Sequence, residues 1–198
     1  MIPLSLSGDW MGLARGFLKM KKELPPAMEQ LLCSAHAQLI REITPGFVYA
    51  LFACRPTPLG VELAPGGFCL PGQSVRRHLA GCDRVVLMCV SLGEGAERAL
   101  RRAQAQDMAL CVVMDAVASA LVECACDQAQ ESVQQRLQAP GICFTGRFSP
   151  GYGDLPLDIQ QGFLALLNAR HRLGVSALEG GTLVPRKTVT AFWGVQSL

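Results

Sequence analysis

The sequence predicts an α+β fold, a single domain with a twisted, mixed but largely antiparallel sheet and a long helix packed across it. The clearest strand is the continuous apolar run over residues 84–91 (RVVLMCVS), which is typical of a strand buried on both faces. A helical pattern then extends from Asp107 to about residue 138, roughly 45 Å at ~1.5 Å per residue. Two late strands, 175–178 and 188–195, are short and separated by turns, which argues against a regular doubly wound sheet.

The other elements follow from apolar spacing and from the positions of glycine and proline. A helix is expected over residues 25–43, because apolar residues recur there at helical spacing and Pro45-Gly46 ends the pattern. Ser74 is expected to cap a helix that ends at Gly81, and Asp107 to cap the long helix. The remaining expected elements are strands over 47–53, 61–63 and 142–145 and helices over 93–106 and 157–170.

Composition bounds the class of protein. The 198 residues fit one domain, 1–198, and a hydrophobic share of 50% argues against disorder. The net charge of +2 gives no basic footprint for nucleic acid. The nine cysteines are odd in number and include no Cys-x-x-Cys pair, which argues against a disulfide framework or a zinc ribbon and fits a reducing cytoplasm. The three histidines are isolated, so no metal site is predicted.

One apolar segment needs to be weighed against a membrane span. The run over residues 108–126 is close to spanning length, but Asp115 and Glu123 interrupt it and each would be costly in lipid. The first residues show no export signal. We therefore expect a cytoplasmic protein with no membrane segment, in which this run is a core helix.

The most informative stretch is residues 147–158, which read RFSPGYGDLPLD. Pro150 fixes its own φ and Gly151 can take positive φ, so the stretch is expected to form a rigid loop rather than a regular element. Arg147 can hold a carboxylate or phosphate through two parallel hydrogen bonds. The ring of Tyr152 can cover a flat group that approaches the glycine. The loop therefore suits a ligand with a carboxylate at one end and an aromatic ring at the other.

A second candidate feature lies on the long helix. Asp115, Ser119 and Glu123 are spaced four apart and share one face, where two carboxylates in apolar surroundings would attract a cation or an arginine. An ordinary solvent face is the competing interpretation, because polar residues continue along the same stripe. These are Asp127, Gln130, Glu131 and Gln134. No nucleophile elbow, dinucleotide fingerprint or lysine-bearing phosphate loop is present, so no catalytic residue is assigned.

Residues 147–152 resemble the Arg-x-x-x-Gly-Tyr motif of the S-adenosylmethionine-binding activation domain of cobalamin-dependent methionine synthase. The resemblance covers residues 74–195, and residues 1–73 resemble the family loosely. Four further parts of the chain also resemble the family. They are the strand and turn at 81–87 and 91–93, and the segments 114–123, 173–175 and 184–191. Two departures, Gly153 in place of proline and the end of the chain at Leu198, resemble the free-standing branch of the family.

The resemblance implies an accessory role in methyl transfer. A free-standing activation domain would bind S-adenosylmethionine and serve a short methionine synthase that lacks its own activation domain. Its partners would be the cobalamin-binding region of that synthase and a flavodoxin- or ferredoxin-like electron donor, and the cobalamin would stay on the partner. The protein would position the methyl group for reductive methylation of inactive cobalt, with no side-chain nucleophile.

The resemblance also suggests residue roles. Arg147 would hold the methionyl carboxylate, and Glu123, or more weakly Asp115, would face the amino group or the sulfonium. The loop would present backbone groups and a ring to the rest of the ligand. The loop residues concerned are Ser149, Pro150, Gly151 and Tyr152, and the candidates for a pocket wall are Phe192 and Trp193.

Two other classes remain open at the level of sequence. The chain could be a non-catalytic S-adenosylmethionine sensor or scaffold that keeps the loop without serving a synthase. The nine cysteines leave a thiol-based redox or metal protein as a further alternative.

Overall fold

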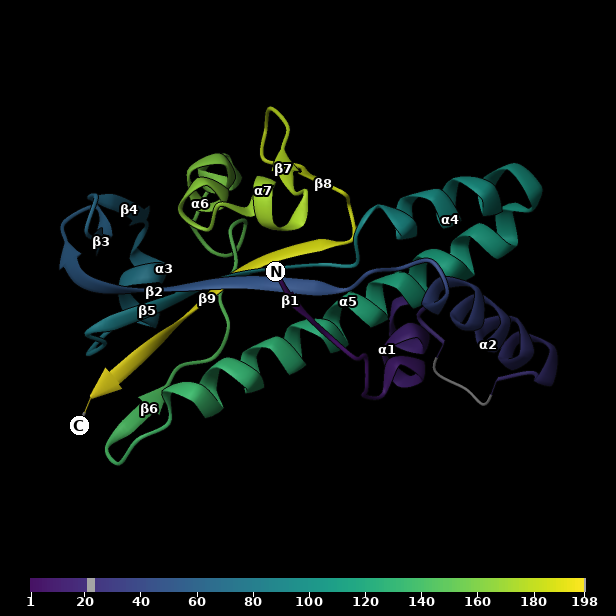
Figure 1. The fold of residues 1–198 in the computed structure, drawn as a ribbon, viewed down its shortest axis with the longest axis horizontal. Coiled ribbons are helices and arrows are strands. Elements are labelled where there is room, and N and C mark those ends of the chain that lie inside the picture. The colour runs from purple at the N-terminus through teal and green to yellow at the C-terminus, as the bar shows by residue number, and fades with distance from the viewer. Residues whose placement is uncertain (21–23, 198) are drawn as a thin grey trace.

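The computed structural model describes residues 1–20 and 24–197 and is built around one twisted sheet (Figure 1). The strands are β1 (Ile2–Pro3), β2 (Gly46–Thr57), β3 (Gly60–Ala64), β4 (Phe68–Pro71), β5 (Arg84–Ser91), β6 (Ile142–Phe144), β7 (Ser176–Ala177), β8 (Leu183–Val184) and β9 (Thr188–Ser197). The helices are α1 (Trp10–Phe17), α2 (Pro26–Ile40), α3 (Gln73–His78), α4 (Glu94–Gln106), α5 (Met108–Leu137), the 3-10 turn η1 (Leu157–Ile159), α6 (Gln160–Leu166) and α7 (Ala169–Leu173).

The sheet has the order β4-β3-β2-β5-β9-β6, with β1 beside β2 and a separate β7–β8 hairpin. Every strand pairing within the described ranges is antiparallel. The α+β class, the largely antiparallel sheet and the long helix across it are therefore as predicted, and the described strands include no parallel pair.

The central strand β5 is apolar along its length because both of its faces are covered. Val86, Met88 and Val90 contribute to the core beneath α5, whereas Val85 and Leu87 contribute to the core beneath α6 and α7. Figure 1 shows α5 running along one side of the sheet with α1 and α2 against it, while α6, α7 and the β7–β8 hairpin lie on the other side. The sheet thus separates two hydrophobic cores.

The helix α5 begins where the sequence predicted, because the side chain of Asp107 accepts a hydrogen bond from the amide of Ala109 at 2.8 Å. By length and composition alone this helix could cross a membrane, but 61% of its most apolar window is buried inside the protein. It packs against α1, α2, α4 and the sheet. These contacts support the interpretation of a core helix.

Three parts of the fold differ from the prediction. The helix expected over 157–170 is divided, because Asn168 takes a left-handed conformation (φ 50°) between α6 and α7. Ser74 does not cap α3, since Gly72 (φ 114°) occupies the N-cap position and contributes no side chain there. The short elements β1, α1 and β4 were not anticipated, because runs this short carry little periodicity.

Burial governs the chemistry of the cysteine thiols. Burial raises the pKa of Cys126 to about 12 and also raises that of Cys89. At Cys54, burial, helped by the neighbouring Cys82 and Asp83, raises the pKa of the thiol to about 11. Since the thiolate is the reactive form, these thiols are poor candidates for redox chemistry at neutral pH.

We expect a native thiol titration near neutral pH to find few fast-reacting groups. Cys33 and Cys143 are exposed and should react first, whereas Cys89 and Cys126 are buried and should react only after unfolding. Modification sites read by mass spectrometry after short exposure to a thiol reagent would check this. Rapid native modification of Cys89 or Cys126 would contradict the burial described here and revive the redox alternative.

Candidate functional site

The loop predicted as the functional stretch begins as a continuation of β6 along β9. Phe144 is opposite Val195, but further along Phe148 is opposite Phe192, so the loop side contains one residue more than β9 over this interval. The backbones of Phe148 and Phe192 exchange two hydrogen bonds of 2.8 Å. The extra residue makes a β-bulge, which re-aims the side chains that follow it.

The bulge determines which way Arg147 points. Phe144 packs on the core beneath α5, and Phe148 packs on the opposite core beneath α6 and α7. In a regular strand these two side chains, four residues apart, would face the same side. The bulge moves Phe148 to the other face and leaves Arg147 on the side of α5.

The guanidinium of Arg147 forms ion pairs with two carboxylates of α5. Its Nη1 donates to Oδ1 of Asp127 at 2.7 Å and its Nη2 to Oε2 of Glu123 at 3.4 Å. The arginine side chain is 23% exposed, against 39% for Glu123 and 67% for Asp127. The arginine therefore pairs with Glu123, one of the two carboxylates expected to attract a cation or an arginine, and with Asp127. The other expected carboxylate, Asp115, pairs with Lys187. Because a guanidinium has five N–H donors, three remain for other partners.

These groups open into a cavity of about 420 Å³ between α5, the loop and β9. That volume lies in the range of roughly 300–1,000 Å³ typical of small-molecule sites. One cation and two carboxylates face it, which gives its lining a net negative charge. The lining residues are Glu123, Asp127, Gln130, Gly146, Arg147, Ser149, Tyr152 and Val189.

The turn of the loop is held by its own backbone. The amide of Gly151 donates to the carbonyl of Leu155 at 2.9 Å, and that of Tyr152 donates to the carbonyl of Ser149 at 3.1 Å. These two amides were expected to face a ligand, but the turn uses them. The side chain of Tyr152 is instead available, since it is 61% exposed and its ring lies edge-on to Phe148. Gly151 takes φ +93°, as the sequence indicated.

Other residues proposed for the site lie outside the cavity. Asp115 lies two helical turns from Glu123 and pairs with Nζ of Lys187 at 2.9 Å. Phe192 and Trp193 are fully buried in the two opposite cores, and Pro150, which is part of the turn, is also buried. Neither aromatic residue lines the cavity.

Sequence reasoning also missed residues that line the site. Asp127 and Gln130 had been assigned to a solvent face, yet they continue the stripe of Glu123. The signal that could have found Asp127 is its spacing of four residues from Glu123. Val189 carried no signal, because an apolar residue in a strand normally indicates core.

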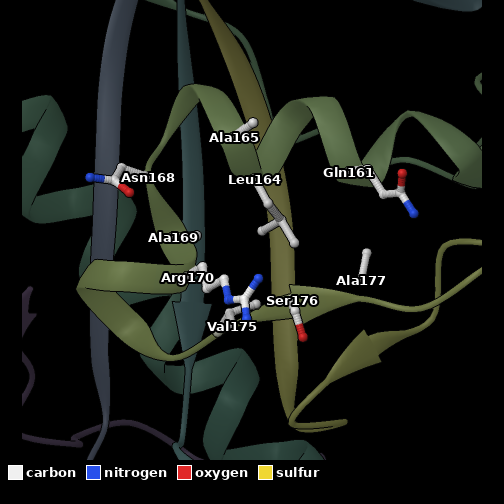
Figure 2. A pocket seen from close by; sticks show the side chains of 9 residues that line it. All are labelled: Gln161, Leu164, Ala165, Asn168, Ala169, Arg170, Val175, Ser176 and Ala177. Carbon is white, nitrogen blue, oxygen red and sulfur yellow. The ribbon is translucent and has the colours of Figure 1, made fainter.

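A second cavity of about 350 Å³ lies between α6, α7 and β7, on the far side of the sheet (Figure 2). Figure 2 shows Leu164 and Arg170 extending toward residues 175–176. Among the described residues, the lining of this second cavity is mostly apolar and has one charged side chain, that of Arg170, so it offers no paired charges to orient a ligand. The cavity at Arg147 is lined by paired charged side chains and by the loop that the sequence predicted as functional. We therefore take it as the candidate site.

Comparisons with known proteins support the fold. No family model matches the sequence, and no curated protein matches it. Among solved structures, the MetH reactivation domain bound to AdoHcy is similar to this chain with a TM-score of 0.67. The match covers 94% of this chain and 73% of that chain at 16% sequence identity. This likeness shows a shared fold.

Replacing Gly151 should strain the loop. At φ +93° any side chain is unfavourable, and an added Cβ would lie 3.0 Å from Cδ2 of Leu157. We expect Gly151→Ala to lower the free energy of unfolding by about 1–3 kcal/mol. Gly146→Ala is the matched control, because no atom of the described residues lies within 4 Å of its added Cβ. Urea denaturation of both variants measures the difference, and equal stability would refute the strained geometry at Gly151.

Proposed function

We propose that this protein is an S-adenosylmethionine-binding accessory protein for reductive methylation of the cobalamin cofactor of a methionine synthase that lacks its own activation domain. Support comes from the cavity at Arg147, which suits a small zwitterionic ligand. Further support is the shared fold with the MetH reactivation domain bound to AdoHcy, S-adenosylhomocysteine. The single observation that carries the proposal is the placement of Arg147, Glu123 and Asp127 around one cavity.

The ligand's charges match those of the cavity. S-adenosylmethionine carries a carboxylate, an ammonium and a sulfonium group, and so has a net positive charge. Its carboxylate would take the remaining donors of Arg147, while its cationic groups would lie near Glu123 and Asp127. The exposed ring of Tyr152 would cover the adenine.

The chemistry asked of this chain is positioning. The cavity lining, taken from the described residues, contains no histidine, cysteine or lysine, and its two carboxylates, Glu123 and Asp127, are ion-paired with Arg147. In the proposed reaction the partner's cobalamin is the substrate: a flavodoxin- or ferredoxin-like donor would supply one electron, and S-adenosylmethionine would supply the methyl group and leave as S-adenosylhomocysteine. The loop and α5 would hold the sulfonium methyl toward the mouth of the cavity and exclude water from it.

Removal of the arginine should weaken ligand binding. Arg147→Ala loses charge-assisted hydrogen bonds to the carboxylate, so we expect S-adenosylmethionine affinity to fall by about 1.5–3 kcal/mol. Arg147→Lys is the control, because it keeps the positive charge without the planar guanidinium. Its affinity should lie between that of the parent protein and that of Arg147→Ala. Calorimetry on both variants checks this. Parent-like affinity in Arg147→Ala would remove this residue from the site.

The reaction itself tests function as distinct from binding. A cobalamin-loaded fragment of a short synthase, with its cobalt in the inactive (II) state, is mixed with a low-potential electron donor and S-adenosylmethionine. Adding this protein should speed the appearance of the methylcobalamin absorbance spectrum, and the Arg147→Ala variant should do so less. If the protein binds S-adenosylmethionine but leaves the rate unchanged, the sensor alternative is favoured and the accessory role is wrong.

A further inference from the structure

We propose that α3 is the support on which the site loop is positioned, with Asp154 and His78 as positioning residues for the ligand although neither lines the cavity. This inference rests on the proposed function and goes beyond it, because it assigns roles to two residues that touch no ligand. It is carried by contacts at both ends of α3.

The first contact joins the end of the loop to the start of α3. The carboxylate of Asp154 accepts hydrogen bonds from the amide of Gln73 at 2.7 Å and from that of Ser74 at 3.0 Å. No side chain at the N-cap position of α3 makes this bond, since that residue is Gly72. A residue some eighty positions away in the chain thus caps this helix.

The fit between these two segments is close. A Cβ added at Gly72 would lie 2.5 Å from Oδ1 of Asp154, and a Cβ added at Gly153 would lie 2.6 Å from Oγ of Ser74. Both glycines have positive φ, at 114° and 56°. The two backbones approach each other at a distance that other residues would not permit.

The hydrogen bonds donated by the amides of Ser74 and Gln73 hold the pKa of Asp154 below its usual range. The capping carboxylate is therefore charged at neutral pH, and the cap would be lost only in acid.

The second contact joins the last residue of α3 to the start of the loop. The Nε2 of His78 lies 2.9 Å from the carbonyl oxygen of Gly146 and 3.1 Å from Oγ1 of Thr145. Its ring also packs on Phe148, with centroids 5.0 Å apart. The hydroxyl of Thr145 in turn accepts a hydrogen bond from the amide of Gly194 in β9 at 2.8 Å. His78 therefore holds the bulge that aims Arg147.

The two contacts bracket the residues proposed to meet the ligand. Gly146 directly precedes Arg147, and Asp154 follows Tyr152 by two positions. A helix of the length of α3 spans about 9 Å at ~1.5 Å per residue, so both ends of the loop are fixed to one short rigid element. Loss of either contact would free the loop without removing any atom from the cavity, and a freer loop binds more weakly because binding must order it.

Four variants test this. Calorimetry with S-adenosylmethionine, well below each variant's melting temperature, should show roughly tenfold weaker binding for Asp154→Ala and for His78→Phe. Asp154→Asn should recover part of the loss, because its amide oxygen still accepts one hydrogen bond. The matched control is Asp107→Ala, which removes the cap of α5 at Ala109 (2.8 Å), far from the loop, and should bind as the parent does.

Hydrogen exchange without ligand gives a second readout. The amides of Gly151 and Tyr152 should exchange faster in Asp154→Ala and His78→Phe than in the parent and in Asp107→Ala. If Asp154→Ala does not fold, Asp154→Asn carries the comparison. Parent-like affinity and exchange in folded variants would overturn the positioning role alone. A parent protein that does not bind S-adenosylmethionine would overturn the proposed function, and the positioning role with it.

Discussion

One extra residue between β6 and the Phe148–Phe192 pair governs the geometry of the site. Without this bulge, strict alternation would direct Phe148 toward α5 and Arg147 away from it. With it, Phe148 fills the core on one side of the sheet and the guanidinium of Arg147 reaches Asp127 on the other. The position of Arg147 at the cavity and its ion pairs with α5 follow from that change of face.

The loop is then fixed from three directions. The strand β9 binds its backbone, α5 pairs with its arginine, and α3 holds both of its ends. This arrangement gives a physical reason for glycine at position 153, where the sequence comparison above noted a glycine in place of proline. Its φ of 56° is closed to proline, whose ring fixes φ near −65°, so a proline here would require a different loop path. The backbone at this position suits glycine, which also allows the close approach to Ser74.

The sequence predicted the long elements well and the local ones poorly. The run at 84–91 and the helix from Asp107 were readable because many residues repeat one pattern. The bulge was not readable, since it depends on pairing between residues distant in the chain. The same holds for Asp154, whose role requires α3 to lie beside it. Asp127 could have been found from its spacing to Glu123, but a solvent face has the same pattern.

The proposed function depends on binding of S-adenosylmethionine in the cavity at Arg147 through matched charges. Calorimetric titration of the unmodified protein with S-adenosylmethionine and S-adenosylhomocysteine, at low and at raised salt, tests it most directly. The lining has a net negative charge, so the cationic sulfonium ligand should bind more tightly than the neutral product, and salt should narrow the difference. If neither compound binds, or if S-adenosylhomocysteine binds more tightly at both salt concentrations, binding through matched charges is contradicted.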